Sequence, residues 1–142
     1  MIGPPASEES NFHGHVTQKA FVFHKDDDIL LVRSDSDNPW SIPGGRVQDG
    51  EDADEALKRE LREETGLAVH VGHPVHAMTD VWFTADGEPM FTVVYDCETS
   101  DTEITLNHEH EECGWVSPAE ATDRMPIEPL ELAVKRAVTR RQ

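Results

Sequence analysis

Basic residues are scarce in this chain. Only 12 residues are Lys or Arg, against 29 Asp or Glu, so the formal net charge is −17. This excess of acid argues against non-specific binding to nucleic acid or to an anionic membrane, because both need a basic protein face. It also disfavours electrostatic capture of a phosphate compound by the surface as a whole. A metal ion and local Arg side chains would have to supply that attraction.

Cysteines and long apolar runs are also few. The two cysteines, Cys97 and Cys113, match neither a metal motif nor a disulfide framework, so a reducing interior is expected. No run approaches the ~18 apolar residues of a membrane span. Residues 1–18 lack the basic region and apolar core of a signal peptide. We therefore predict a cytoplasmic protein without a membrane partner.

The length of 142 residues suits one domain, which we place at 16–142. Residues 1–15 are rich in Gly, Pro, Ser and Glu and are expected to form a flexible segment. His13 and His15 form a His-x-His pair there, for which a frayed polar terminus is a better interpretation than a metal site. The low Lys count, four against eight Arg, resembles proteins of salt-loving organisms, in which salt screens self-repulsion. An ordinary acidic protein is the alternative.

The strongest local signal is a helix predicted over 53–64. Asp52 is a good N-cap residue, and Glu55 has the capping-box spacing from it. Gly66 suits the left-handed position that ends a helix. The residues between are mainly Ala, Leu, Lys, Arg and Glu, which are strong helix formers.

Glutamates occupy the apolar side of this helix. On a helical wheel Leu57 and Leu61 define an apolar stripe, with Glu60 and Glu64 in its middle and Glu63 at its edge. Unpaired carboxylates on a buried face are costly, so they need a compensating cation. Mg²⁺ and Mn²⁺ prefer oxygen ligands of this kind. A solvated helix rich in Glu is the alternative interpretation.

Residues 45–67 match every defined position of the Nudix hydrolase signature, and the chain therefore resembles that family. The matching positions are Gly45, Glu51, Arg59, Glu60, Leu61, Glu63, Glu64, Gly66 and Leu67. So many specified positions at fixed spacing make a highly specific motif. The lead-in at 39–45, Pro-Trp-Ser-Ile-Pro-Gly-Gly, is also similar to the family's approach to its signature.

The resemblance implies a metal site built from this signature. Its ligands for Mg²⁺ or Mn²⁺ would be Glu60, Glu63, Glu64 and the carbonyl of Gly45. Arg59 would orient a glutamate rather than touch substrate. Glu63 or Glu64 would be a candidate to take the proton from an attacking water.

A glutamate outside the signature often reaches the metal site in this family, from the segment before a Trp near the last strand. Glu109 and Glu112 are the candidates here for a catalytic role, and Glu111 is also available. A solvated acidic loop is the alternative. Three aromatic residues are candidates for contact with substrate: Trp40, Trp82 and Phe83. Each of them could instead belong to the core.

The remaining pattern predicts further strands and two helices. Strands are expected over 17–24 and 29–33, joined by a turn, and over 68–78, with Val69, Val71 and Val75 on one side. A hairpin of 80–83 with 90–97 and an edge strand over 102–106 should follow, with 90–97 central in the sheet. Helices over 118–124 and 128–140 close the chain. This order resembles the Nudix α/β/α sandwich with a mixed β-sheet.

The function implied is Mg²⁺-dependent hydrolysis of the phosphoanhydride bond of a nucleoside diphosphate linked to another moiety, by a monomer or homodimer. Two alternatives remain open. One is a Nudix-fold binding or regulatory module that has lost catalysis, against which the intact signature argues. The other is isopentenyl diphosphate isomerase, a relative that uses a cysteine and a glutamate; Cys97 and Cys113 lack its flanking pattern.

Overall fold

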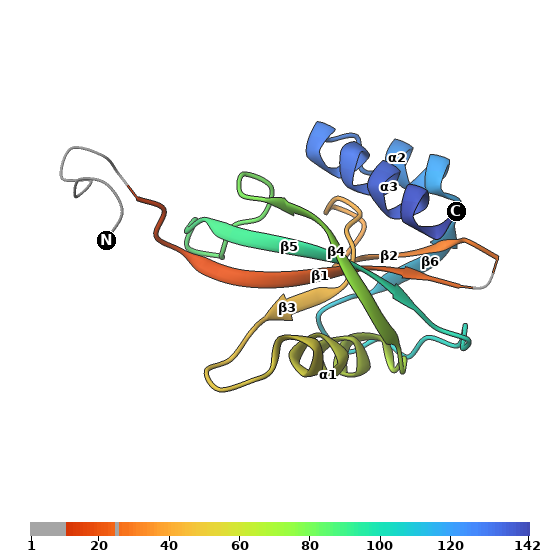
Figure 1. Ribbon diagram of the computed structural model, residues 1–142, viewed down its shortest axis with the longest axis horizontal. Coiled ribbons are helices and arrows are strands. Elements are labelled where there is room, and N and C mark those ends of the chain that lie inside the picture. The colour runs from red at the N-terminus through yellow and green to blue at the C-terminus, as the bar shows by residue number, and fades with distance from the viewer. Residues whose placement is uncertain (1–10, 25) are drawn as a thin grey trace.

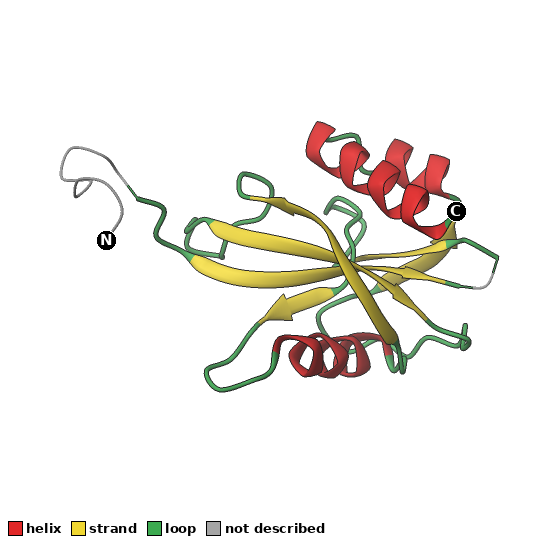
Figure 2. Ribbon diagram, in the orientation of Figure 1, coloured by secondary structure: helices red, strands yellow, loops and turns green. Residues whose placement is uncertain are grey.

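Helices cover both faces of one β-sheet (Figure 1; Figure 2). The computed structural model describes residues 11–24 and 26–142. Its helices are α1 (Ala53–Thr65), α2 (Pro118–Arg124) and α3 (Glu128–Arg141). In Figure 1, α1 lies on one side of the sheet, and α2 and α3 lie together on the other. This arrangement confirms the α/β/α sandwich. Among the described residues, no helix has the length and apolar character needed to cross a membrane.

The sheet is mixed, as predicted. Its strands are β1 (His15–Phe23), β2 (Ile29–Arg33), β3 (Gly44–Arg46), β4 (His70–Met78), β5 (Met90–Glu98) and β6 (Glu112–Val116). Five of them follow the order β4-β5-β1-β2-β6, and β3 pairs with β1 beside this path. Strands β1 and β5 are parallel, whereas the other pairs are antiparallel. Strand β5 is therefore interior, which its apolar sequence predicted.

Alternation along β1 divides the core into two layers. Phe21 and Phe23 are fully buried in the layer under α2 and α3. Ala20 and Val22 are fully buried in the layer under α1. Successive strand side chains point to opposite faces, so this one apolar strand supports both helical layers.

Strand β1 also changes partner along its length. Its segment 17–19 pairs with β3, whereas Phe23 pairs with Ile29 of β2. Gly44 thereby lies opposite Lys19, and Gly45 lies opposite Gln18. Because α1 packs against β3, the glycines are held between the central strand and the helix that carries the glutamates.

The prediction that three valines of 68–78 share one face was wrong. Val69 and Val71 pack with the layer under α1, but Val75 is buried in the layer under α2 and α3. The register between β4 and β5 shifts between Val71 and Pro74 and again between Pro74 and His76. Such a bulge inserts a residue, so the side chains that follow move to the opposite face.

Two predicted strands are not formed. Residues 80–83 contribute one isolated bridge, between Phe83 and Pro89. Residues 102–106 are irregular, because the backbone of Thr105 bonds to the end of α1 rather than to the backbone of a neighbouring strand. The N–H of Thr105 donates to the carbonyl of Thr65 at 2.9 Å.

The predicted boundary between the N-terminal segment and the domain lies within one residue of the first strand. Strand β1 begins at His15, where the imidazole pairs with Glu88 at 2.9 Å. Residues 11–14 precede this strand, and residues 1–10 of the predicted segment lie outside the described part of the chain.

Candidate active site

Helix α1 begins and ends close to its predicted bounds and turns glutamates inward. The side chain of Asp52 accepts a hydrogen bond from the N–H of Glu55 at 3.2 Å. Gly66 follows the helix at φ 77°, a conformation that glycine adopts at little cost. The leucines of the apolar side are fully buried, and Glu64 beside them is 4% exposed. A carboxylate this buried requires donors or positive charge around it.

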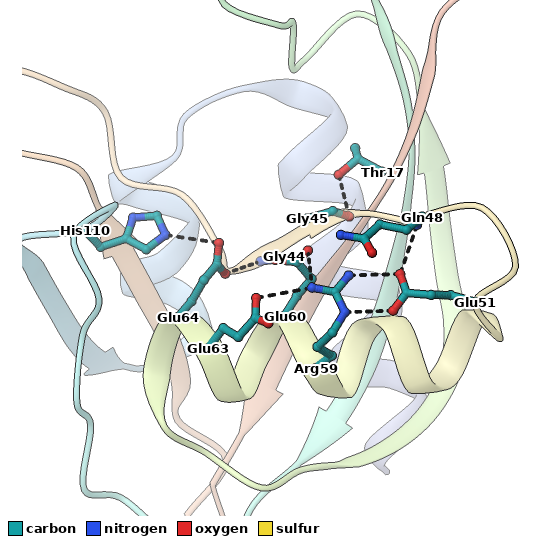
Figure 3. Close-up of polar contacts among 10 residues, drawn as sticks. All are labelled: Thr17, Gly44, Gly45, Gln48, Glu51, Arg59, Glu60, Glu63, Glu64 and His110. Atoms are coloured by element: carbon teal, nitrogen blue, oxygen red, sulfur yellow. Dashed lines mark hydrogen bonds and ion pairs between the residues drawn. The ribbon is translucent and has the colours of Figure 1, made fainter.

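Gly44 and Gly45 bring the main chain against these glutamates (Figure 3). The N–H of Gly44 donates to Oε2 of Glu64 at 2.9 Å. Gly45 lies so close to Glu60 that a Cβ added there would overlap the Glu60 carboxylate. The carbonyl of Gly45 accepts a hydrogen bond from the Thr17 hydroxyl at 2.9 Å. That bond fixes the direction of the carbonyl and leaves a second lone pair for another partner.

Arg59 is held among three glutamates of the signature. Its Nε and Nη2 donate to both carboxylate oxygens of Glu51, at 2.7 and 2.9 Å. Its Nη1 lies 3.1 Å from Glu60 and 3.2 Å from Glu63. The hydrogen bond from Arg59, with that from the backbone of Gln48, lowers the pKa of Glu51. The guanidinium is thus engaged by carboxylates, as expected of a residue that orients them.

The loop before β6 brings a further carboxylate and an imidazole to Glu64. Nε2 of His110 lies 3.7 Å from Oε1 of Glu64 (Figure 3). One potential ligand atom each of Glu64, Glu109 and His110 lie within 4.8 Å of one another. These three side chains are close enough to share one ion.

Glu60, Glu64 and Glu109 with His110 are called the acidic group, because negative charge exceeds positive charge among them. Hydrogen bonding to Glu64 is the main cause that raises the pKa of Glu109, followed by burial. Burial is the main cause that raises the pKa of Glu60, and Glu64 and Glu63 add to it against Arg59. A divalent cation would relieve this repulsion, and the oxygen-rich donor set suits Mg²⁺ or Mn²⁺. Cation affinity should rise with pH, because the ligands must first lose their protons.

The acidic group, Gly44 and Gly45 line one open cleft of about 640 Å³. Besides the glycines and the acidic group, its lining includes Thr17, Lys19, Arg46, Trp82, Phe83 and Met90. A volume of this size suits a small-molecule ligand. The cleft therefore combines a cation-binding group with aromatic and basic side chains.

The model of the NUDIX domain family matches residues 14–139. The chain belongs to the Nudix family. Among its Nudix relatives, the nucleoside triphosphatase NudI of Escherichia fergusonii is 37% identical over 87 residues. That stretch covers 56% of this chain and 62% of the relative, which is less than two thirds of the relative's length.

Solved structures show the same Nudix fold. The MutT protein from Methanosarcina mazei Go1 has a TM-score of 0.77 at 21% identity, over 94% of this chain and 99% of that one. A C. elegans Ap4A hydrolase in a binary complex has a TM-score of 0.75 at 19% identity, over 88% of this chain and 96% of that one. At these identities the similarity shows the fold alone.

The cleft brings together six of the ten site residues predicted from the sequence. The predicted residues that line it are Gly45, Glu60, Glu64, Glu109, Trp82 and Phe83. Glu63 stands at the edge of the group, where its side chain is 57% exposed and paired with Arg59. Its position matches the edge that the helical wheel assigned to it.

Glu112 and Trp40 lie elsewhere. Oε2 of Glu112, on β6, accepts from Nε and Nη2 of Arg33 at 3.0 and 2.7 Å. Trp40 packs against the core layer of α2 and α3, with the guanidinium groups of Arg33 and Arg124 at 4.4 and 5.1 Å from its ring centroid. The structure therefore separates both residues from the acidic group.

The cleft residues that were not predicted include Thr17, Lys19 and His110. The sequence held a signal for His110, because it directly follows Glu109 in a segment already singled out. It held none for Thr17 and Lys19, whose positions depend on the pairing of β1 with the distant β3.

Proposed function

We propose that this chain hydrolyses the phosphoanhydride bond of a nucleoside diphosphate linked to another group, with Mg²⁺ or Mn²⁺ as cofactor. The observation that carries this proposal is the convergence of three carboxylates, Glu60, Glu64 and Glu109, with the Gly45 carbonyl on one cleft. Fold similarity alone would not support an activity, so the donor set of the site must do so.

Residues of the Nudix signature would bind the cation. Glu60 and Glu64 would contribute carboxylate oxygens and Gly45 its oriented carbonyl, whereas Glu63 would join them only by leaving Arg59. When bound, the ion would neutralise charge on the diphosphate and lower the pKa of a water molecule bound to it.

Glu109 is our candidate for the general base. It reaches the group from a loop rather than from the helix, and its raised pKa brings it nearer to the range useful for proton transfer. Glu64 is less suited to this task because Gly44 and His110 already contact its oxygens.

The aromatic residues of the cleft would hold the nucleoside. Phe83 is 50% exposed, and Trp82 is half-buried beside it. Exposed aromatic faces of this kind stack on bases without strong preference for one base. Because the relative NudI is a nucleoside triphosphatase by name, nucleoside triphosphates are the first substrates to test.

A metal-activated substrate screen tests the proposal. The panel would contain nucleoside triphosphates, ADP-ribose, sugar nucleotides and diadenosine polyphosphates. We expect at least one compound to yield phosphate-bearing products with Mg²⁺ or Mn²⁺, and none to do so in excess EDTA. Binding of nucleotides without turnover on any compound would instead indicate the regulatory module and refute the hydrolase.

Substituting each of the two candidate glutamates outside the signature distinguishes their roles. Glu109→Gln should lower kcat by about 10²-fold or more, which is the ordinary contribution of a general base. Glu112→Gln should leave kcat nearly unchanged and cost at most about 1 kcal/mol of stability, because it removes only a part-exposed ion pair with Arg33. Steady-state kinetics on the best substrate of the screen measure both variants. A larger loss of kcat in Glu112→Gln than in Glu109→Gln would reverse the assignment.

The cysteines argue against isomerase chemistry. Cys97 is buried in the layer under α1, where burial raises the pKa of its thiol to about 12. Cys113 lies on β6, and neither described cysteine lines the cleft. Analysis of products formed from isopentenyl diphosphate would detect the isomerase directly.

We further propose a cytoplasmic monomer or homodimer from a salt-loving organism, with no nucleic-acid partner. Both cysteines are free, which suits a reducing compartment. The net charge of −17 supports tolerance of high salt, which screens the repulsion between acidic groups.

A further inference from the structure

Lys19 is a basic side chain inside the acidic cleft. It projects from the central strand β1, and its residue lies opposite Gly44. Its Nζ donates to the carbonyl of Ile42 at 3.2 Å and lies 5.0 Å from the centroid of the Trp82 ring. The ammonium is therefore positioned by the lead-in segment and by one of the aromatic residues of the cleft.

The ammonium retains hydrogen-bonding capacity that no carboxylate takes up. Within the described residues, no carboxylate oxygen lies within 4.0 Å of Nζ. An ammonium has three N–H donors, and the Ile42 carbonyl uses one. Burial lowers the pKa of Lys19, while Glu64, Glu109 and Glu60 raise it through their charges. The side chain is thus attracted by the acidic group but not paired with a member of it.

An acidic cleft needs local cations if it is to admit a polyphosphate. Among the described residues that line it, Lys and Arg are represented by Lys19 and Arg46, and Arg46 is the more exposed. The glutamates occupy some of the coordination positions of the cation. The cation can therefore bind only some of the oxygens of a diphosphate. The remaining phosphate oxygens require N–H donors, and charged donors bind them most strongly.

We propose that Lys19 binds a phosphate oxygen of the substrate, between the acidic group and Trp82. This inference rests on the proposed function, because it assigns a contact to the substrate of the same cleft. It makes Lys19 a substrate-binding residue and places the diphosphate so that the nucleoside extends toward the aromatic residues.

A purely structural role for Lys19 predicts different behaviour. If Lys19 only offset the charge of the glutamates and packed on Trp82, its removal would loosen the site and weaken every ligand. If Lys19 binds phosphate, its removal should weaken phosphate ligands alone. It should leave Mg²⁺ affinity unchanged or tighter, because a nearby positive charge that repels the cation has been removed. The two roles therefore differ in cation affinity: the structural role predicts weaker Mg²⁺ binding in the variant, and the phosphate-binding role does not.

Calorimetric titration with Mg²⁺ alone and with magnesium imidodiphosphate, a non-hydrolysable pyrophosphate analogue, tests the inference. The proteins would be the intact chain, Lys19→Met, Lys19→Arg and Lys58→Met. Lys58 is a control for loss of one lysine charge, because it projects from α1 and pairs with Glu55 at 3.6 Å. We expect imidodiphosphate affinity to fall about tenfold or more in Lys19→Met and to recover substantially in Lys19→Arg. It should remain within about twofold in Lys58→Met, because screened surface charges contribute little.

Three results would overturn the inference. These are unchanged imidodiphosphate affinity in Lys19→Met, loss of Mg²⁺ affinity in parallel with it, or no imidodiphosphate binding by the intact chain. Turnover in the substrate screen separates this failure from failure of the proposed function. If the intact chain hydrolyses a substrate and Lys19→Met binds imidodiphosphate with unchanged affinity, the lysine contact is rejected and the proposed activity is retained. No cation binding by the intact chain would reject both.

Discussion

Glu64→Gln should lower kcat by about 10³-fold while the protein remains folded. The loss reflects several kcal/mol of charge stabilisation that the held cation supplies to the reacting phosphate. The fold should survive because the glutamine oxygen can still accept the hydrogen bond from Gly44, and the side-chain volume is retained. In the absence of metal, stability should be equal or higher, since a nearly buried charge has been removed. Steady-state kinetics and thermal unfolding in EDTA measure the two effects.

Glu55→Gln provides the matched control for this variant. Glu55 belongs to the same helix and makes an exposed contact with Lys58, away from the cleft. Its kcat should remain within about twofold of the unmodified protein, because exposed ion pairs have small energies. Equal kcat values for Glu64→Gln and Glu55→Gln would show that the inward carboxylate has no role in the reaction.

Gly44→Ala should destabilise the protein by about 3 kcal/mol or more. An added Cβ would overlap the carbonyl oxygen of Gln18 and crowd the Cα of Lys19, both of which are backbone atoms of the central strand. Backbone in a packed sheet cannot yield as a flexible side chain can, so β3 would have to separate from β1. Chemical denaturation should show a lower midpoint, and failure to accumulate folded protein would be the extreme form of the same result.

Alanine substitutions at two other glycines distinguish the loss of stability caused by this overlap from the effect of adding a methyl group elsewhere. In Gly45→Ala the Cβ would meet the Glu60 carboxylate, the far end of a flexible side chain. That variant should stay folded but bind divalent cations at least about tenfold more weakly, as Glu60 is displaced. Gly114→Ala has no heavy atom within 4 Å of the new Cβ and should change stability by less than about 0.5 kcal/mol. Equal stability of Gly44→Ala and Gly114→Ala would contradict the close approach of β3 to β1.

Local signals were sufficient to predict α1, the family and the inward direction of the α1 glutamates that line the cleft. Asp52 and Gly66 delimit the helix through contacts within a few residues, and the structure contains those contacts. The inward direction of Glu64 follows from the 3.6-residue period of the helix, so it was visible in the sequence. The same period placed Glu63 at the edge, where it is exposed and bound to Arg59.

Features that depend on distant pairing could not be predicted in this way. The choice between Glu109 and Glu112 depends on where the loop ends and β6 begins: Glu109 lies in the loop beside Glu64, whereas Glu112 lies in β6 beside Arg33. The face of Val75 depends on a bulge opposite β5; Pro74 signals an irregularity there, but it does not indicate which side chains move to the opposite face. The segment at 102–106 has strand-like composition, but the end of α1 binds its backbone instead. In each case tertiary contacts override the local pattern.

Mn²⁺ binding, followed by electron paramagnetic resonance, tests most directly whether the inward carboxylates of α1 hold a divalent cation. The intact chain should bind Mn²⁺ more tightly at about pH 8 than at about pH 5, because the raised pKa values of Glu60 and Glu109 leave these cleft carboxyls more protonated, and so less negative, in acid. Glu64→Gln should weaken binding at least about tenfold at the higher pH, and Glu55→Gln should not. Equal Mn²⁺ affinity in all three proteins, or no binding at either pH, would contradict the account.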